Sequence, residues 1–296
     1  MSSIAVGRDA HLLGVILVLA SALAFSLAGV LTKAIAADAW MIACWRGLVG
    51  GALIAVYVAV SDRRAPLRAR VRLGWRGWVL ASIGSLASLA FIFAFKLTYV
   101  ANVAAIYATA PFIAAGLGWW LLRERLQWRT ATAAVASLLG VVVIVAGGLG
   151  TGRAPGDGVA LLMTFGSALY MVLIRQFRDT PVVLAGGVSG LQLFVVAWLA
   201  VDPLAVSRQD VWLLLLFGLS FAVAVVLWTE GTRLIPAPES GLLGSAETPL
   251  AILLAWLLLA ELPPTASWAG GAIVLAAVLV HAAGDAARVR GLRRHP

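Results

Sequence analysis

The sequence predicts an all-α membrane protein of ten transmembrane helices, arranged as two inverted five-helix repeats around a central cavity. Three observations lead to this prediction: the composition, ten long apolar runs and an internal repeat. The 296 residues are 62% hydrophobic and 12% charged, whereas soluble domains are about 45–50% apolar and about 25% charged. A water-soluble fold of this length could not bury so much apolar surface, so a lipid bilayer is the expected surrounding.

Ten apolar runs are long enough to cross the hydrocarbon core of a bilayer, which needs about 20 residues of helix. Only short connections separate them, and these leave no room for a soluble domain. The runs are 11–33, 39–60, 77–98, 103–122, 130–149, 156–174, 182–201, 211–229, 240–259 and 267–287.

The formal charge of +9 indicates orientation and not nucleic-acid binding. Most of the 22 lysines and arginines fall in segments that share one face of the membrane, including Arg63, Arg64, Arg68 and Arg70 after the second run. Positive residues collect on the cytoplasmic side of membrane proteins, so both termini are expected in the cytoplasm. The preference for arginine and alanine further indicates a GC-rich bacterial genome, and hence the bacterial inner membrane.

Two stretches repeat one pattern. "ATAPFIAAGLGWWLLRERL" begins at position 108, and "SAETPLAILLAWLLLAEL" begins at position 245. Each carries a proline inside its apolar run, Pro111 or Pro249, and each closes on a glutamate, Glu124 or Glu261. The two glutamates would lie at opposite faces of the membrane, where we expect them to anchor helix ends or a gate.

A second, weaker match relates the sequence after Gly14 to the sequence after Gly158. We therefore expect one repeat over 1–150 and another over 151–296, with five spans each. Because five is odd, the second repeat must begin on the opposite side of the membrane. Inverted repeats of this kind are typical of secondary transporters, whose substrate site lies between the repeats near the middle of the bilayer.

The doubled motifs resemble the paired repeats of the EamA family, which belongs to the drug/metabolite transporter superfamily. The resemblance rests on "ATAP…WWLLRERL" followed by "LLGVVVIVAGG", and on "AETP…WLLLAEL" followed by "GGAIVLAAVLV". In addition, "ACWRGLVGGALI" is similar to the family's second-helix arginine segment. The resemblance implies ten helices, an inverted five-plus-five repeat and export of small metabolites, amino acids among them.

Two ionisable residues lie deep inside predicted spans, where a charge costs about 2.5–3.5 kcal/mol on insertion scales and therefore indicates function. Arg46 can offer its guanidinium group to a substrate carboxylate or phosphate, or else can tie its helix to carbonyls or a carboxylate nearby. Glu247 suits proton coupling or capture of a substrate amine. Alternatively, it hydrogen-bonds within the bundle or pairs with Arg46, and such a pair could open to hold a zwitterion.

Pro111 and Pro249 each remove one helical hydrogen bond, which frees the carbonyl groups of Tyr107 and Ser245. Free carbonyls at this depth are tolerated only where protein or a water-filled cavity satisfies them. The fourth and ninth spans are therefore expected to line the cavity, with the prolines acting as kinks for gating. A kink that serves only packing is the alternative.

Tyr107, Tyr170, Trp228 and Gln192 lie at comparable depth. Aromatic walls with a few polar points suit a small amphipathic ligand, although tryptophan and tyrosine also form belts at membrane interfaces. The predicted substrate-binding residues are Arg46, Tyr107, Tyr170, Gln192, Trp228, Ser245 and Glu247.

The sequence thus favours a secondary transporter that exports small amphipathic metabolites such as amino acids. Coupling to protons or ions, and a homodimer formed through the aliphatic fifth and tenth spans, are compatible with it. A membrane channel, or a scaffold or receptor without transport, is the alternative. Nucleophile motifs, glycine-rich phosphate loops and clustered metal ligands are absent from the sequence, so we expect no catalytic residues, no cofactor and no metal.

Overall fold

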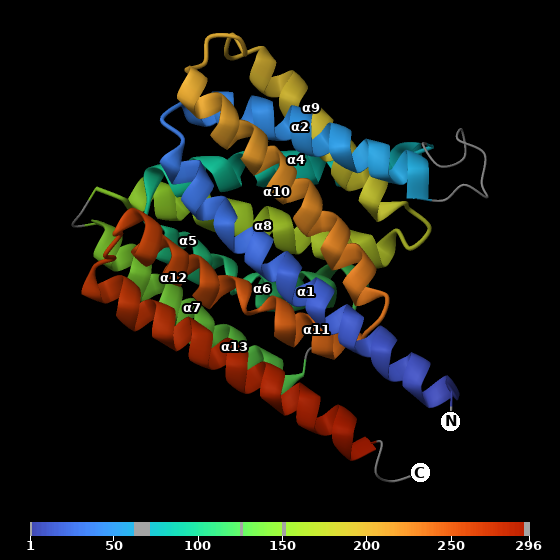
Figure 1. Cartoon of the computed structure of the whole chain (residues 1–296). Coiled ribbons are helices and arrows are strands. Elements are labelled where there is room, and N and C mark those ends of the chain that lie inside the picture. The colour runs from blue at the N-terminus through green and yellow to red at the C-terminus, as the bar shows by residue number, and fades with distance from the viewer. Residues whose placement is uncertain (1, 62–71, 125–126, 150–151, 293–296) are drawn as a thin grey trace.

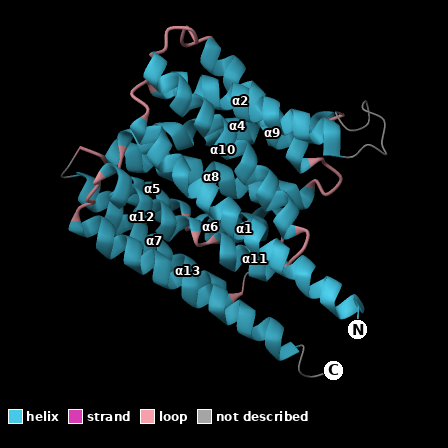
Figure 2. Cartoon of the chain, in the orientation of Figure 1, coloured by secondary structure: helices cyan, strands magenta, loops and turns pink. Residues whose placement is uncertain are grey.

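The structure is a computed structural model of the whole chain, and it describes residues 2–61, 72–124, 127–149 and 152–292. Every regular element in these ranges is helical, as Figure 2 shows. Arg63, Arg64, Arg68 and Arg70, which contribute to the predicted charge asymmetry, lie outside the described residues. The helices are α1 (Ser2–Ala34), α2 (Ala39–Ser61), α4 (Gly74–Leu97), α5 (Val100–Tyr107), α6 (Ala110–Leu122), α7 (Trp128–Leu149), α8 (Ala154–Gln176), α9 (Val182–Trp198), α10 (Arg208–Thr232), α11 (Ala237–Gly244), α12 (Glu247–Leu259) and α13 (Thr265–Leu292).

The helices form one bundle and run between two ends (Figure 1). Both termini lie at the same end, which we name the terminal end, and the opposite end is named the far end. Helix α1 runs from the terminal end to the far end, whereas α8 runs in the opposite direction.

Seven helical stretches in the described ranges are long and apolar enough to cross a membrane, and one of them combines α5 and α6. Three shorter apolar helices accompany them: α9, α12 and the Thr265–His281 part of α13. The sequence predicted ten full spans. The three shorter helices occupy the other three predicted runs: α9 ends at Trp198, before its predicted end, a break divides the run at 240–259, and α13 is counted over Thr265–His281 alone.

Exposed tryptophans gather at both ends of the bundle. Trp119, Trp120 and Trp128 are exposed at the terminal end, and Trp212 and Trp268 are exposed at the far end. Tryptophan favours the two membrane–water interfaces because its ring is apolar and its N–H group is polar. These side chains are therefore placed as interfacial belts and not as cavity walls.

Two of the apolar runs are broken in the middle, and the breaks match. Helices α5 and α11 have 8 residues each, and helices α6 and α12 have 13 residues each. The residue that follows each longer half is left-handed, with φ 55° at Arg123 and 50° at Ala260. Each of these residues donates its N–H to a carbonyl in the last turn, that of Gly118 or Ala255. The two segments therefore share one local design.

The prolines begin new helices and do not kink continuous ones as the sequence predicted. Pro111 is the second residue of α6, and Pro249 is the third residue of α12. A proline is tolerated in the first turn because N–H groups there have no helical partner. The preceding segments, 108–109 and 245–246, separate the two halves of each run. Each half can consequently change its direction without bending the other.

The helix pairs with the most extensive packing also match between the two halves of the chain. Helix α1 packs on α10, α4 packs on α8, α2 packs on α9, and α7 packs on α13. Glycine permits two of these crossings. A Cβ atom added at Gly51 would lie 2.9 Å from the carbonyl oxygen of Gly187, and one added at Gly140 would lie 2.7 Å from that of Gly270. Small residues let helix backbones approach closely in this way.

The first helices of the two halves align differently from the sequence match. A Cβ atom on Gly14 would collide with Leu234, and one on Gly156 would collide with Leu97. Leu234 and Leu97 occupy equivalent positions before α11 and α5. The packing thus relates Gly14 to Gly156, whereas the sequence alone suggested Gly158.

Candidate functional site

A cavity of about 1320 Å³ lies between the helices and extends from the middle of the bundle toward the terminal end. Side chains of α1, α4, α8 and α10 form most of its walls, and the breaks after α5 and α11 form its floor. Its lining includes Gln127, just before α7, and Val182, the first residue of α9, and both of these helices begin at the terminal end (Figure 1). The cavity is therefore reached from that end.

Arg46 lies in the wall of this cavity and is only 6% exposed. It donates a hydrogen bond from Nη1 to Ser88. Its guanidinium carbon lies 5.4, 5.2 and 4.1 Å from the ring centres of Phe91, Phe217 and Phe221. These distances are typical of cation–π contacts, which stabilise a charge without neutralising it.

The charge on Arg46 has no carboxylate partner among the described residues. Its Nε atom is buried and has no hydrogen-bond acceptor. An unpaired buried donor costs free energy, so this atom is an exception among the buried polar groups of the bundle. The predicted pair of Arg46 with Glu247 is not formed in this structure.

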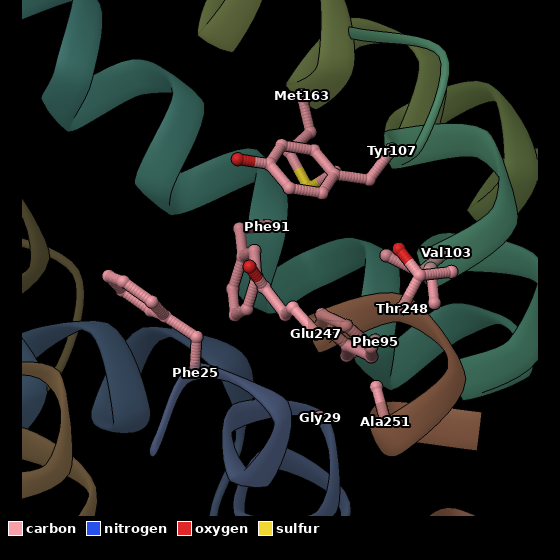
Figure 3. Close-up of a pocket in the computed structure, with 11 residues that line it drawn as sticks. Phe25, Gly29, Phe91, Phe95, Val103, Tyr107, Met163, Glu247, Thr248 and Ala251 are labelled. Atoms are coloured by element: carbon pink, nitrogen blue, oxygen red, sulfur yellow. The ribbon is translucent and has the colours of Figure 1, made fainter. Parts of the chain in front are cut away.

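Glu247 is the first residue of α12 and lines both the main cavity and a small recess of about 20 Å³ at its deep end. Figure 3 shows its carboxyl group projecting among Phe25, Phe91 and Tyr107. A helix N-terminus favours a negative charge, which explains why a carboxylate is tolerated there. The residue lines the cavity and forms no ion pair with the described residues.

The remaining predicted residues divide into two groups. Tyr107, Tyr170, Trp228 and Ser245 line the cavity. The indole ring of Trp228 lies against the end of α11, since a Cβ atom on Gly244 would be 2.7 Å from it. Pro111 and Pro249 also line the cavity, beside the two breaks.

Gln192 does not line the cavity. It points from α9 toward α4, where its Nε2 atom donates to Ser82 at 3.3 Å. Helical position alone placed Gln192 at the right depth, but depth does not tell which face of a helix looks inward. Ser189, one turn earlier on α9, is the residue that reaches the cavity.

Sequence reasoning missed the aromatic cage around Arg46. Phe91 belongs to α4, and Phe217 and Phe221 belong to α10. Phenylalanine on an apolar helix faces lipid as readily as protein, so composition could not single these three out. The spacing of Phe217 and Phe221, four residues apart on one helix face, was the available signal.

The far end of the cavity is closed by polar contacts between distant segments. Lys33, at the end of α1, forms an ion pair of 2.7 Å with Glu261, which follows α12. The other carboxylate oxygen of Glu261 accepts a hydrogen bond from the backbone N–H of Val100, the first residue of α5. Glu261 was expected to anchor a helix end or a gate, but its contact with Lys33 was not predicted.

A second contact at the far end involves Asp157 in the first turn of α8. Its Oδ1 atom accepts hydrogen bonds from Thr98 at 2.7 Å and from Asn102 at 2.9 Å. All three side chains are at most 1% exposed. Asp157 thereby fixes the corner between α4 and α5.

The described residues offer no metal site, because no three or more histidine, cysteine, aspartate or glutamate side chains gather within them.

Comparison with known proteins shows the family. The family model for EamA-like transporters matches the chain twice, over residues 12–146 and 154–282. The chain belongs to the EamA-like transporter family. This family is part of the drug/metabolite transporter superfamily, so the protein is a multi-pass membrane protein of a transporter family.

Individual relatives of this EamA-like protein are distant. An uncharacterized transporter of Synechocystis sp. is 26% identical over 227 residues, which cover 69% of this chain and 65% of the relative. The match thus spans just under two thirds of that protein. A solved crystal structure is 22% identical, covers 92% of this chain and 97% of its own, and has a TM-score of 0.63. At that identity the likeness concerns the fold alone.

Proposed function

We propose that this EamA-like protein is a secondary transporter that moves small amphipathic metabolites through the central cavity by alternating access. The observation that carries the proposal is a cavity that extends toward the terminal end and is lined by Arg46 and Glu247, neither of which forms an ion pair with the described residues. A channel would need a path that is open at both ends at once. The contacts of Lys33, Glu261 and Asp157 close such a path.

Two inverted repeats, 1–150 and 151–296, with five membrane crossings each, form the proposed framework. Matching breaks, matching left-handed residues and the two matches of the family model support this framework. Inverted repeats can exchange their conformations, so that a path open at one end becomes a path open at the other. Together α11 and α12 supply 8 and 13 residues, or about 32 Å of helix at 1.5 Å per residue, which suffices for one crossing.

The proposed substrate carries an anionic group, an amine and an apolar body. Arg46 would bind the anionic group, since guanidinium donors pair well with carboxylates. The start of α6 also faces the cavity near Pro111, and a helix N-terminus attracts anions. Glu247 would bind the amine, and the rings of Tyr107 and Trp228 would contact the apolar body. Amino acids and related compounds meet this description.

The terminal end is proposed to face the cytoplasm of a bacterial cell, with the protein in the inner membrane. The charge asymmetry of the loops supports this orientation. A cavity loaded from the cytoplasm suits an exporter. Glu247 is a candidate for proton coupling, because the same carboxyl group would bind either a proton or a substrate amine.

The proposal is tested with three matched compounds in membrane vesicles: an aromatic amino acid, its decarboxylated amine and its deaminated acid. The parent protein should prefer the amino acid. Arg46→Ala should abolish the advantage over the amine, and Glu247→Gln should abolish the advantage over the acid, each by about tenfold for a lost charged contact. Arg208→Ala, an exposed position at the start of α10, is the matched control. Equal rates for all compounds in all variants would refute the site.

A further inference from the structure

We infer that Glu261 and Glu124 are paired positioning residues that cap two half-helices in turn and thereby set which end of the cavity is closed. In the present conformation Glu261 caps α5 at the far end. In the opposite conformation Glu124 caps α11 at the terminal end. This inference rests on the proposed alternating access.

The cap on α5 is seen directly. The first N–H groups of a helix have no helical partner, and the N–H of Val100 donates to a carboxylate oxygen of Glu261. Tyr99, the residue before α5, has φ −69° and ψ 144° and provides no side-chain cap of its own. Glu261 therefore supplies from a distant segment what the local sequence lacks.

The opposite oxygen of Glu261 holds Lys33 at 2.7 Å, and the two side chains are only 10% and 18% exposed. Tyr99 completes the cluster, because the ammonium group of Lys33 lies 5.8 Å from its ring centre. Charge-assisted contacts with little water around them are stronger than exposed ones. One carboxylate thus joins the end of α1, the end of α12 and the start of α5.

The terminal end has residues equivalent to those of the far-end cluster, but there they do not join three helices. Glu124 follows α6 as Glu261 follows α12, and each donates its N–H to the last turn of its helix. Arg175 ends α8 as Lys33 ends α1, and Arg175 pairs with Glu124 at 3.1 Å. Here, however, the two side chains are 47% and 46% exposed, and the described residues of α6 and α11 do not pack extensively on each other.

The start of α11 is prepared for the same cap. Pro236, the residue before α11, has φ −61° and ψ 144°, nearly the values of Tyr99 before α5, and it provides no side-chain cap. Helix α5 packs on α12 and α13, whereas α11 makes no comparable contact with α6 or α7. Moving α11 toward the end of α6 would bring the N–H of Ala237, the first residue of α11, to Glu124, because Pro238 has no N–H and that of Glu239 donates to Pro236. That motion would close the terminal end.

Only one cap is made at a time in each open conformation, because making both would close both ends of the cavity. The helix breaks allow the exchange, since α5 and α11 can each move without α6 and α12. The caps therefore link helix position at one end to access at that end.

The test uses single cysteines as reporters in a chain whose one cysteine, the buried Cys44, is replaced by alanine. Ala104→Cys reports on the deep recess near α5, and Gly241→Cys reports on α11 in the cavity. These positions are equivalent in the two half-helices. A membrane-impermeant maleimide is added to vesicles of either orientation, and the labelling rate of each reporter is measured.

Glu261→Ala should raise labelling of the Ala104→Cys reporter from the far side by about tenfold, the effect of losing a charge-assisted contact. It should lower labelling of the Gly241→Cys reporter from the terminal side. Glu124→Ala, the matched variant, should not raise labelling at Ala104→Cys, because its cap is not in use. Unchanged labelling in Glu261→Ala, or equal effects of the two variants, would overturn the inference.

The exchange variant Lys33→Glu with Glu261→Lys separates the cap from the ion pair. It keeps two opposite charges, but a lysine cannot accept a hydrogen bond from α5. The far end should therefore remain open to the reagent, as in Glu261→Ala. Return to the parent labelling rate would show that the ion pair alone closes this end, and the capping inference would be wrong.

If Glu261→Ala unfolds, both reporters will label faster, and gel filtration will show the loss of the monodisperse peak. Glu261→Met then replaces it, because methionine keeps the length and apolar packing of the side chain but offers α5 no strong acceptor. A shift in the same direction supports the cap, and no shift overturns it.

These measurements need no substrate. If the labelling rates of the two reporters change as expected while no compound is transported, the capping inference is supported and the proposed substrate class is wrong. If the Arg46 and Glu247 variants change substrate selectivity while the Glu261 variants leave labelling unchanged, the proposed function is supported and the capping inference is wrong.

Discussion

The two ends of the bundle are built from equivalent helices but are held together differently. At the far end, the ion pair of Lys33 and Glu261 is nearly buried, and Asp157 adds two further hydrogen bonds. At the terminal end, the ion pair of Arg175 and Glu124 is almost half exposed.

The difference between the ends teaches that equivalent sequence does not impose equivalent packing. By the correspondence of Gly14 with Gly156, Asp157 corresponds to Val15, which has no polar group to offer. The far end therefore has a stabilising contact that the terminal end lacks. Four changes test this comparison, from the largest expected effect to the smallest.

The largest effect is expected at Arg46, which lies where the two halves meet. Arg46→Met should reduce transport by about 100-fold, since the charged contact with substrate is lost. The melting temperature should not fall, because removing an unpaired buried charge relieves its desolvation cost. Arg46→Lys should restore little, because lysine lacks the planar group that stacks on Phe221. Vesicle transport and thermal unfolding in detergent measure the two effects, and loss of both together would indicate a structural role.

The next effect is expected at Gly244, where α11 meets Trp228. Gly244→Ala should reduce transport by about tenfold, because the added methyl group must displace the indole ring from the cavity wall, at a cost of about 1–3 kcal/mol. Gly116→Ala on α6 is the matched control, since a Cβ atom there meets no atom within 4 Å. Similar losses in both variants would show that helix α11 is not sensitive to this contact.

A moderate effect is expected at Asp157. Asp157→Asn keeps the shape of the side chain but weakens its hydrogen bonds to Thr98 and Asn102. The far end should open more often, and labelling of the Ala104→Cys reporter from that side should rise about fivefold, as expected for a loss of about 1 kcal/mol. Val15→Ala, at the corresponding position of the other half, should leave this labelling unchanged. A rise in both variants would remove the asymmetry between the ends.

The smallest effect is expected at Gln192. Gln192→Ala should leave substrate selectivity within about twofold of the parent, because the side chain contacts Ser82 and not the cavity, and exposed hydrogen bonds contribute little. Ser189→Ala, one turn away and in the cavity wall, should change selectivity more. The same three compounds used for Arg46 and Glu247 measure this, and the reverse ranking would move Gln192 back into the site.

The sequence was sufficient for the fold class and for the depth of key residues. Apolar runs and composition determine that helices cross a bilayer, and the cost of a buried charge marks Arg46 and Glu247 as exceptional. Both do line the cavity. Proline marked the two helix breaks because its missing N–H excludes a continuous helix.

The sequence was insufficient for orientation about the helix axis. Small and aliphatic residues dominate every helix, so no polar stripe tells which face looks inward, and depth alone could not show that Gln192 lies outside the cavity lining. The cage of Phe91, Phe217 and Phe221 around Arg46 was missed for the same reason, since lipid and protein interior are equally apolar. Asp157 was overlooked because it follows Arg153 and Pro155 at a helix start, where an acidic residue is ordinary.

The glycine crossings described above place the pairs α2–α9 and α7–α13 in direct backbone contact. Where no side chain separates two backbones, neither can slide without losing its contacts. The contacts α2–α9 and α7–α13 would then stay fixed during alternating access, while the helices between them move. A covalent cross-link between α2 and α9, or between α7 and α13, should therefore leave transport intact, whereas a cross-link across the cavity should stop it.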